Sequence, residues 1–89
     1  MSLLNDARNK INEIDQKMIE LFKERMNAVK NVLKYKKEHH LAVFDNDREI
    51  EIFNKNINIL ADDELNEYYE IFFNGVLKSS RKYQEDHYE

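Results

Sequence analysis

The sequence contains no proline and a single glycine, Gly75. Proline and glycine are the residues that most often end helices or form tight turns, so little in this chain interrupts a helix. The near absence of both residues predicts an all-α fold.

The chain also lacks cysteine, which excludes disulfides and thiolate metal sites. The pair His39-His40 has no further histidine or carboxylate at metal-ligand spacing on the same face, so we interpret it as part of a loop. The sequence shows neither a Gly-rich phosphate loop nor a Ser/His/Asp or Cys/His nucleophile arrangement. We therefore expect a protein that uses no metal and no cofactor.

No apolar run approaches the roughly 20 residues of a membrane span. The opening residues, MSLLNDARNK, lack the apolar stretch of a signal peptide, which predicts a cytoplasmic protein without a membrane partner. The net charge of −4 disfavours non-specific nucleic-acid binding. Hydrophobic residues make up 42% and charged residues 36% of the 89 residues, as expected of one ordered domain over residues 1–89.

Apolar residues recur at spacings of three and four along the first part of the chain, which is the pattern of one helix face. This pattern predicts a first helix over residues 5–38, capped by Asn5 or Asp6. The apolar stripe consists of Leu4, Ala7, Ile11, Ile14, Met18, Leu21, Ala28, Val32 and Tyr35.

Two shorter helices follow in the prediction. The first spans residues 47–60 after a loop at residues 39–43, and the second ends near Asp86. The turn at residues 61–64 separates them, and Asp62 or Asp63 is expected to cap the last helix.

The length of the first helix bears on the oligomeric state. Thirty-four residues at 1.5 Å per residue give a helix of about 50 Å, whereas a compact chain of this size has a radius of gyration of about 12 Å. The helix would project beyond the other two, and its apolar stripe runs over the whole length. We therefore expect an intertwined two-fold homodimer.

Arg25 interrupts the apolar stripe of the first helix. A buried guanidinium without a partner costs several kcal/mol, so an anionic group should meet it. A carboxylate on another helix and a bound anion are both possible partners. Lys36 lies within about 20° of Arg25 on the helix face and about 16 Å further along the axis, so the two could clamp a small dianion between them. Otherwise Lys36 is a solvated lysine.

Arg8 lies about 42 Å from Lys36 along the same helix, too far for one small ligand to contact both. If Arg8 serves the same pocket, it must come from an antiparallel first helix of a second subunit. Otherwise it is a surface residue.

Ser80 and Gln84 follow apolar residues on one face of the third helix and are neighbours at spacing i, i+4. Two neutral hydrogen-bonding groups on an inward face predict a polar cavity, and the alternative is a helix end that turns to solvent.

The segment FDNDREIE, residues 44–51, combines Asp45, Arg48 and Glu49 at the start of the second helix. Asp45 or Asn46 can cap this helix, and Asn46 with Glu49 fits a capping box. Helix N-termini also present free N–H groups to anions and hydroxyls, so the segment is a candidate part of a binding site.

Four segments in order resemble the all-helical, type II chorismate mutase family. They are ARNKINEID (7–15), LFKERMNAVKNVLKYK (21–36), VFDNDREIE (43–51) and SSRKYQ (79–84). The first segment matches the family's opening pattern R-x-x-I-x-x-[ILV]-D. Many members have proline before the valine of the loop, where this chain has Ala42.

The resemblance implies an isomerase that rearranges chorismate to prephenate for the synthesis of phenylalanine and tyrosine. It assigns Arg8 of the neighbouring subunit and Lys36 to the enolpyruvyl carboxylate of chorismate. Arg25 would bind the ring carboxylate with help from Ser80, and Asp45 would lie nearby.

The resemblance assigns the substrate hydroxyl to Glu49, with the backbone of Arg48 contributing and its side chain ordering the site. Lys36 and Gln84 would donate hydrogen bonds to the ether oxygen. Two alternatives remain at this point, an isochorismate–pyruvate lyase on the same scaffold and a non-catalytic helical dimerisation module.

Overall fold

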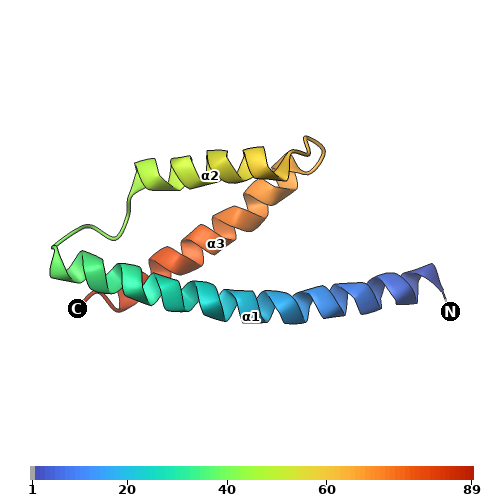
Figure 1. Cartoon of the computed structure of the whole chain (residues 1–89), viewed down its shortest axis with the longest axis horizontal. Coiled ribbons are helices and arrows are strands. Elements are labelled where there is room, and N and C mark those ends of the chain that lie inside the picture. The colour runs from blue at the N-terminus through green and yellow to red at the C-terminus, as the bar shows by residue number, and fades with distance from the viewer. Residues whose placement is uncertain (1) are drawn as a thin grey trace.

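The structure is a computed structural model that describes residues 2–89, and it consists of helices α1 (Leu3–Glu38), α2 (Asn46–Leu60) and α3 (Asn66–Asp86) (Figure 1). Residues 2–89 contain no β-strand, so the predicted all-α fold of one long and two shorter helices is confirmed. None of the helices in this part of the chain combines the length and hydrophobicity needed to cross a bilayer.

The start of α1 differs from the prediction. The helix begins at Leu3, and the hydroxyl of Ser2 accepts a hydrogen bond of 3.1 Å from the backbone N–H of Asn5. The predicted caps, Asn5 and Asp6, therefore lie inside the first turn. Serine is as good a cap as either of them, and Leu3 and Leu4 continue the helical pattern towards the N-terminus.

Asp45 caps α2, and it is one of the two residues that were predicted to cap this helix. Its Oδ1 accepts a hydrogen bond of 3.1 Å from the backbone N–H of Arg48. The capping box of Asn46 and Glu49 does not form, because Asn46 is already the first helical residue and Glu49 pairs with a residue of α3 instead.

The predicted cap of α3 is wrong. The residue that precedes α3 is Leu65, which provides no side-chain hydrogen bond to the helix. Asp62 and Asp63 stabilise the turn itself: the Oδ1 of Asp62 accepts from the N–H of Glu64 over 3.1 Å, and the Oδ1 of Asp63 accepts from the side chain of Asn66 over 3.4 Å.

The dipeptide Asn74-Gly75 lies within α3, although Asn-Gly is a frequent turn sequence in β-hairpins. Helical periodicity continues on both sides of it, with Phe73 and Leu77 buried four residues apart. The packing of this face overrides the local turn preference.

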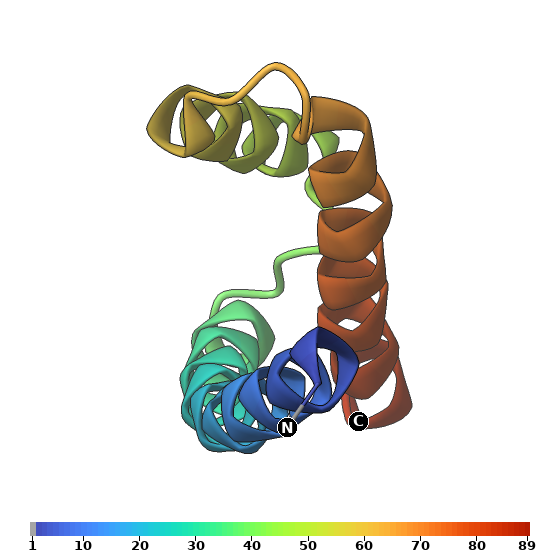
Figure 2. The ribbon, with the colours of Figure 1, turned by 90° about the vertical axis from the view of Figure 1, so that its right-hand side faces the viewer.

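Helix α3 packs against both α1 and α2, and Figure 2 shows it along one side of the molecule, spanning from α2 to α1. The buried apolar residues are few and come from α1 and α3: Val29, Leu33, Phe73 and Leu77. Such a small core predicts that the single chain is marginally stable.

The N-terminal half of α1 extends away from the other two helices (Figure 1). The chain measures 56 × 26 × 16 Å and has a radius of gyration of 16.3 Å, compared with about 12 Å for a compact chain of this length. The apolar stripe on this half of α1 is exposed at Leu4, Ile11, Ile14 and Met18. The single chain therefore leaves a long apolar helix face without cover.

Candidate functional site

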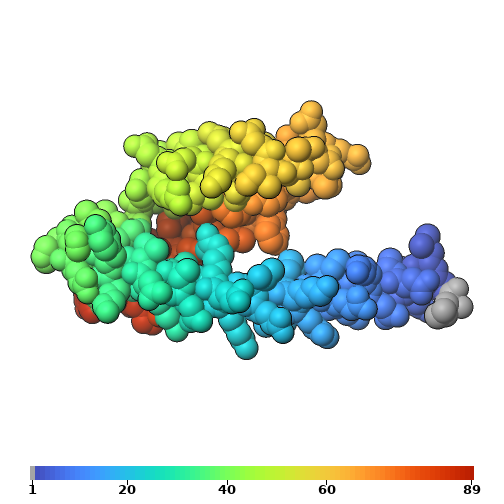
Figure 3. All heavy atoms as spheres, viewed as in Figure 1, coloured from blue at the N-terminus to red at the C-terminus, as the bar shows by residue number. Residues whose placement is uncertain are grey.

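A cavity of about 330 Å³ lies where α1, α2 and α3 meet. The space-filling view shows a hollow between α1 and α2, with atoms of α3 behind it (Figure 3). All predicted site residues except Arg8 line this cavity, namely Arg25, Lys36, Asp45, Arg48, Glu49, Ser80 and Gln84. The structure thus brings together residues from three of the four motif segments.

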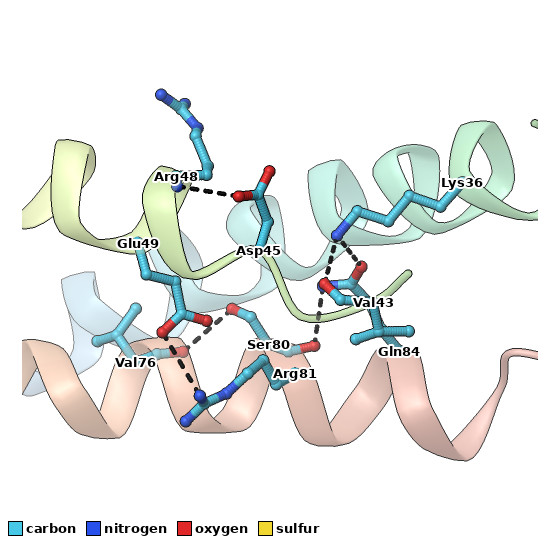
Figure 4. A network of polar contacts seen from close by, with 9 residues as sticks. All are labelled: Lys36, Val43, Asp45, Arg48, Glu49, Val76, Ser80, Arg81 and Gln84. Atoms are coloured by element: carbon cyan, nitrogen blue, oxygen red, sulfur yellow. Dashed lines mark hydrogen bonds and ion pairs between the residues drawn. The ribbon is translucent and has the colours of Figure 1, made fainter. Parts of the chain in front are cut away.

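Lys36 lies on the side of α1 that faces α3, and its ammonium group is directed into the cavity (Figure 4). It donates hydrogen bonds to the backbone carbonyl of Val43 over 2.7 Å and to Oε1 of Gln84 over 3.1 Å. An ammonium group has three N–H donors, so one remains for a ligand. The alternative of a solvated lysine does not hold.

The guanidinium of Arg25 donates a hydrogen bond to the hydroxyl of Ser80, 55 residues away on α3. The Ser80 hydroxyl in turn donates to the carbonyl of Val76 over 3.0 Å. These two bonds fix the hydroxyl so that its oxygen faces Arg25, and Arg25 is held in place while most of its donors remain free.

No carboxylate within residues 2–89 forms an ion pair with Arg25 or Lys36. The alternative of a salt bridge from Arg25 to another helix is therefore not observed. Both cations are half-buried and are held by neutral groups, the hydroxyl of Ser80 and the amide of Gln84. Partly buried positive charge without a countercharge favours an anionic ligand.

Ser80 and Gln84 are 8% and 6% exposed, which excludes the alternative of a helix end turned to solvent. The Nε2 of Gln84 donates to the carbonyl of Ser80 over 3.2 Å, and its Oε1 accepts from Lys36. The amide therefore has a defined orientation, with one N–H of Nε2 left unused.

Arg48 is the predicted residue with the least direct access to the cavity. Its backbone N–H is bound by Asp45, and its side chain is exposed, extends away from the cavity and pairs with Glu51 over 2.8 Å (Figure 4). The resemblance assigned the backbone and the side chain of Arg48 to the site, but both form their contacts within the first turns of α2.

Glu49 extends from α2 towards α3, where its carboxylate pairs with Arg81 over 3.5 Å (Figure 4). Arg81 also lines the cavity, and its guanidinium lies 5.1 Å from the ring centre of Phe44. Arg81 was not among the site residues predicted from the sequence. The signal that could have identified Arg81 was its spacing: it lies three residues before Gln84, which places both on the same side of α3.

Arg8 does not line the cavity. It is exposed on the projecting half of α1, about 26 Å along the helix axis from Arg25. Within one chain, Arg8 is therefore too far from the cavity to contact a small ligand bound there, as helix geometry predicted.

A wider depression of about 760 Å³ lies between the C-terminal ends of α1 and α3 and includes Lys30, Lys37 and Tyr83. It is shallow, and these lysines are exposed. We take the smaller cavity as the candidate site because half-buried polar groups of α1 and α2 converge there with the buried Ser80 and Gln84 of α3. Residues 2–89 contain no cluster of three His, Cys, Asp or Glu side chains that could hold a metal ion.

The family model of chorismate mutase type II matches residues 7–85. The chain belongs to the chorismate mutase type II family. The match covers most of the chain and includes every predicted site residue from Arg8 to Gln84, so the resemblance stated from the motifs is confirmed at the level of the family. No curated protein and no solved structure gives a significant match to this chain.

Chorismate mutases act on a dianion, and the charge in the cavity suits such a ligand. The cationic groups of the lining are those of Arg25, Lys36 and Arg81, because the Arg48 guanidinium extends away from the cavity (Figure 4), and the anionic ones are those of Asp45 and Glu49. Apolar side chains, including those of Val29, Val32 and Leu77, complete the wall. Apolar walls with few fixed polar groups strengthen electrostatic contacts to a bound ligand.

Proposed function

We propose that this member of the chorismate mutase type II family converts chorismate to prephenate in the cytoplasm, in the synthesis of phenylalanine and tyrosine. The observation that carries the proposal is the pair of half-buried cations, Arg25 and Lys36, which face one cavity and are held by neutral partners.

The reaction is an intramolecular [3,3] rearrangement, so it needs no nucleophile, metal or cofactor. The protein must instead fold a flexible dianion into its reactive chair, and cationic clamps on the two carboxylates do this. Arg25, held by Ser80, binds the ring carboxylate. The ammonium charge of Lys36, half-buried at the same cavity, attracts the carboxylate at the other end of the substrate.

Negative charge grows on the ether oxygen as the C–O bond breaks. Donors that are already in place there stabilise the transition state more than the substrate. Lys36 and Gln84 are hydrogen-bonded to each other and each retains one N–H, so both can serve as donors without rearranging. Glu49 accepts a hydrogen bond from the ring hydroxyl.

The working unit that we propose is a homodimer in which Arg8 of each chain enters the site of its neighbour. Two features support this proposal: the apolar stripe on the N-terminal half of α1 is exposed, and Arg8 on the same half lies far from the cavity of its own chain. A second α1 running antiparallel would cover the stripe and bring an arginine to the enolpyruvyl carboxylate.

The proposal is tested by incubating the purified protein with chorismate and following the loss of chorismate absorbance together with prephenate formation. Lys36→Met should abolish most of this activity, and the matched control Lys34→Met, at an exposed neighbouring position, should not. Parallel incubation with isochorismate tests the lyase alternative through salicylate. A folded wild-type protein that leaves chorismate intact would overturn the proposal.

A further inference from the structure

The carboxylate of Glu49 occupies an unusual place for an acidic group. It lines a cavity whose proposed ligand carries two negative charges, and it is 79% shielded from solvent, with only 21% of its side chain exposed. A partly buried carboxylate beside a second anion is repelled unless a cation balances it. Among residues 2–89, the cation that pairs with Glu49 is Arg81.

Arg81 is itself held from two sides. Its Nη1 lies 3.5 Å from Oε1 of Glu49, and its guanidinium faces the ring of Phe44, 5.1 Å from the ring centre. Phe44 belongs to the loop between α1 and α2, and Glu49 to the first turn of α2. One side chain of α3 therefore contacts both the loop and the helix start that close this side of the cavity.

We infer that Arg81 is a positioning residue for Glu49: it balances the charge of this carboxylate and orients it towards the hydroxyl of the substrate. The inference rests on the proposed function and adds a residue to it. A guanidinium suits this task because its planar group can stack on an aromatic ring while its edge binds a carboxylate.

The same position also allows Arg81 to contact a substrate carboxylate directly. The two roles differ in their dependence on Glu49. A residue that acts through Glu49 loses its effect when Glu49 is replaced, whereas a direct clamp keeps its effect. They also differ in their dependence on the ring hydroxyl, which only the first role requires.

The experiment is a double-mutant cycle of Arg81→Gln and Glu49→Gln, measured as kcat/KM for chorismate. We expect Arg81→Gln alone to lower kcat/KM about fivefold, as for one half-buried ion pair, and to have almost no further effect in the Glu49→Gln background. Arg81→Lys keeps the charge but loses the planar group that faces Phe44, so it should restore only part of the loss. The matched control is Lys82→Gln, since Lys82 is exposed and pairs with Asp86.

A chorismate analogue with hydrogen in place of the ring hydroxyl provides the second measurement. Wild type and Arg81→Gln should act on it at equal rates. Far-UV circular dichroism checks the fold, and if Arg81→Gln loses helicity, Arg81→Met is used because its stem retains packing on Phe44.

Additive losses in the cycle, or an equal loss with the analogue, would overturn the inference and leave the proposed function standing. If wild type is active and Arg81→Gln has the same kcat/KM, the inference is likewise overturned and the proposed function stands. A folded wild type without activity on chorismate would overturn both.

Discussion

The Nζ of Lys36 lies 3.1 Å from Oε1 of Gln84, and this hydrogen bond joins the end of α1 to the end of α3. It fixes the orientation of the amide, because the oxygen is committed to Lys36 and the nitrogen to the carbonyl of Ser80. The donors proposed for the ether oxygen are therefore set by contacts within the protein before any substrate is bound.

Gln84→Ala removes one of these donors. We expect kcat to fall about a hundredfold, as is typical for the loss of one preorganised donor at a site of developing charge. KM should change much less, because the contact is strongest in the transition state. Steady-state kinetics with chorismate measure both values. Glu85→Ala, at the exposed neighbouring residue, is the control. A rise in KM at unchanged kcat would mean that Gln84 contributes to binding alone.

Ser80 and Ser79 form a matched pair for a second prediction. The hydroxyl of Ser80 accepts from Arg25, whereas that of Ser79 is exposed and donates only to carbonyls of its own helix, at 3.2 Å from Gly75 and Val76. Ser80→Ala leaves Arg25 without its anchor, and we expect kcat/KM to fall about tenfold through a higher KM. Ser79→Ala should match wild type. Equal effects of the two changes would rule out a specific role of the Arg25–Ser80 contact.

The cap of α2 makes a prediction about stability. Asp45→Ala should lower the free energy of unfolding by about 1 kcal/mol, because the N–H of Arg48 loses its acceptor. Asp45→Asn retains an acceptor and should cost only a fraction of this. Asn46→Ala is the control, since Asn46 is the first helical residue. Urea denaturation followed by circular dichroism gives the three values, and an equal cost at Asn46 would contradict the assignment of the cap.

The sequence predicted the helices well because its composition and periodicity act over short distances. The absence of proline and the spacing of apolar residues from Leu4 to Tyr35 were sufficient to predict α1. The caps were less predictable, because Ser2, Asn5 and Asp6 all favour a helix start. Which of them forms the cap depends on how far Leu3 and Leu4 extend the helix, which local preference does not decide.

The sequence predicted only part of the candidate site. Arg25 was visible because a cation in an apolar stripe breaks a pattern. Arg81 stands in the charged run SSRKYQ, where no pattern is broken, so only the contact between α2 and α3 reveals its pairing with Glu49. The neutral partners of Arg25 and Lys36 likewise depend on how α3 crosses α1, which sequence periodicity does not specify.

In the proposed dimer two chains build each site, with Arg25 from one and Arg8 from the other. The most direct test mixes two inactive variants, Arg8→Ala and Arg25→Ala, after unfolding and refolding them together. Half of the dimers in an equal mixture are heterodimers with one intact site of two, so we predict about a quarter of the wild-type rate of chorismate conversion. A mixture as inactive as its separate components, with both variants folded and dimeric, would contradict the account.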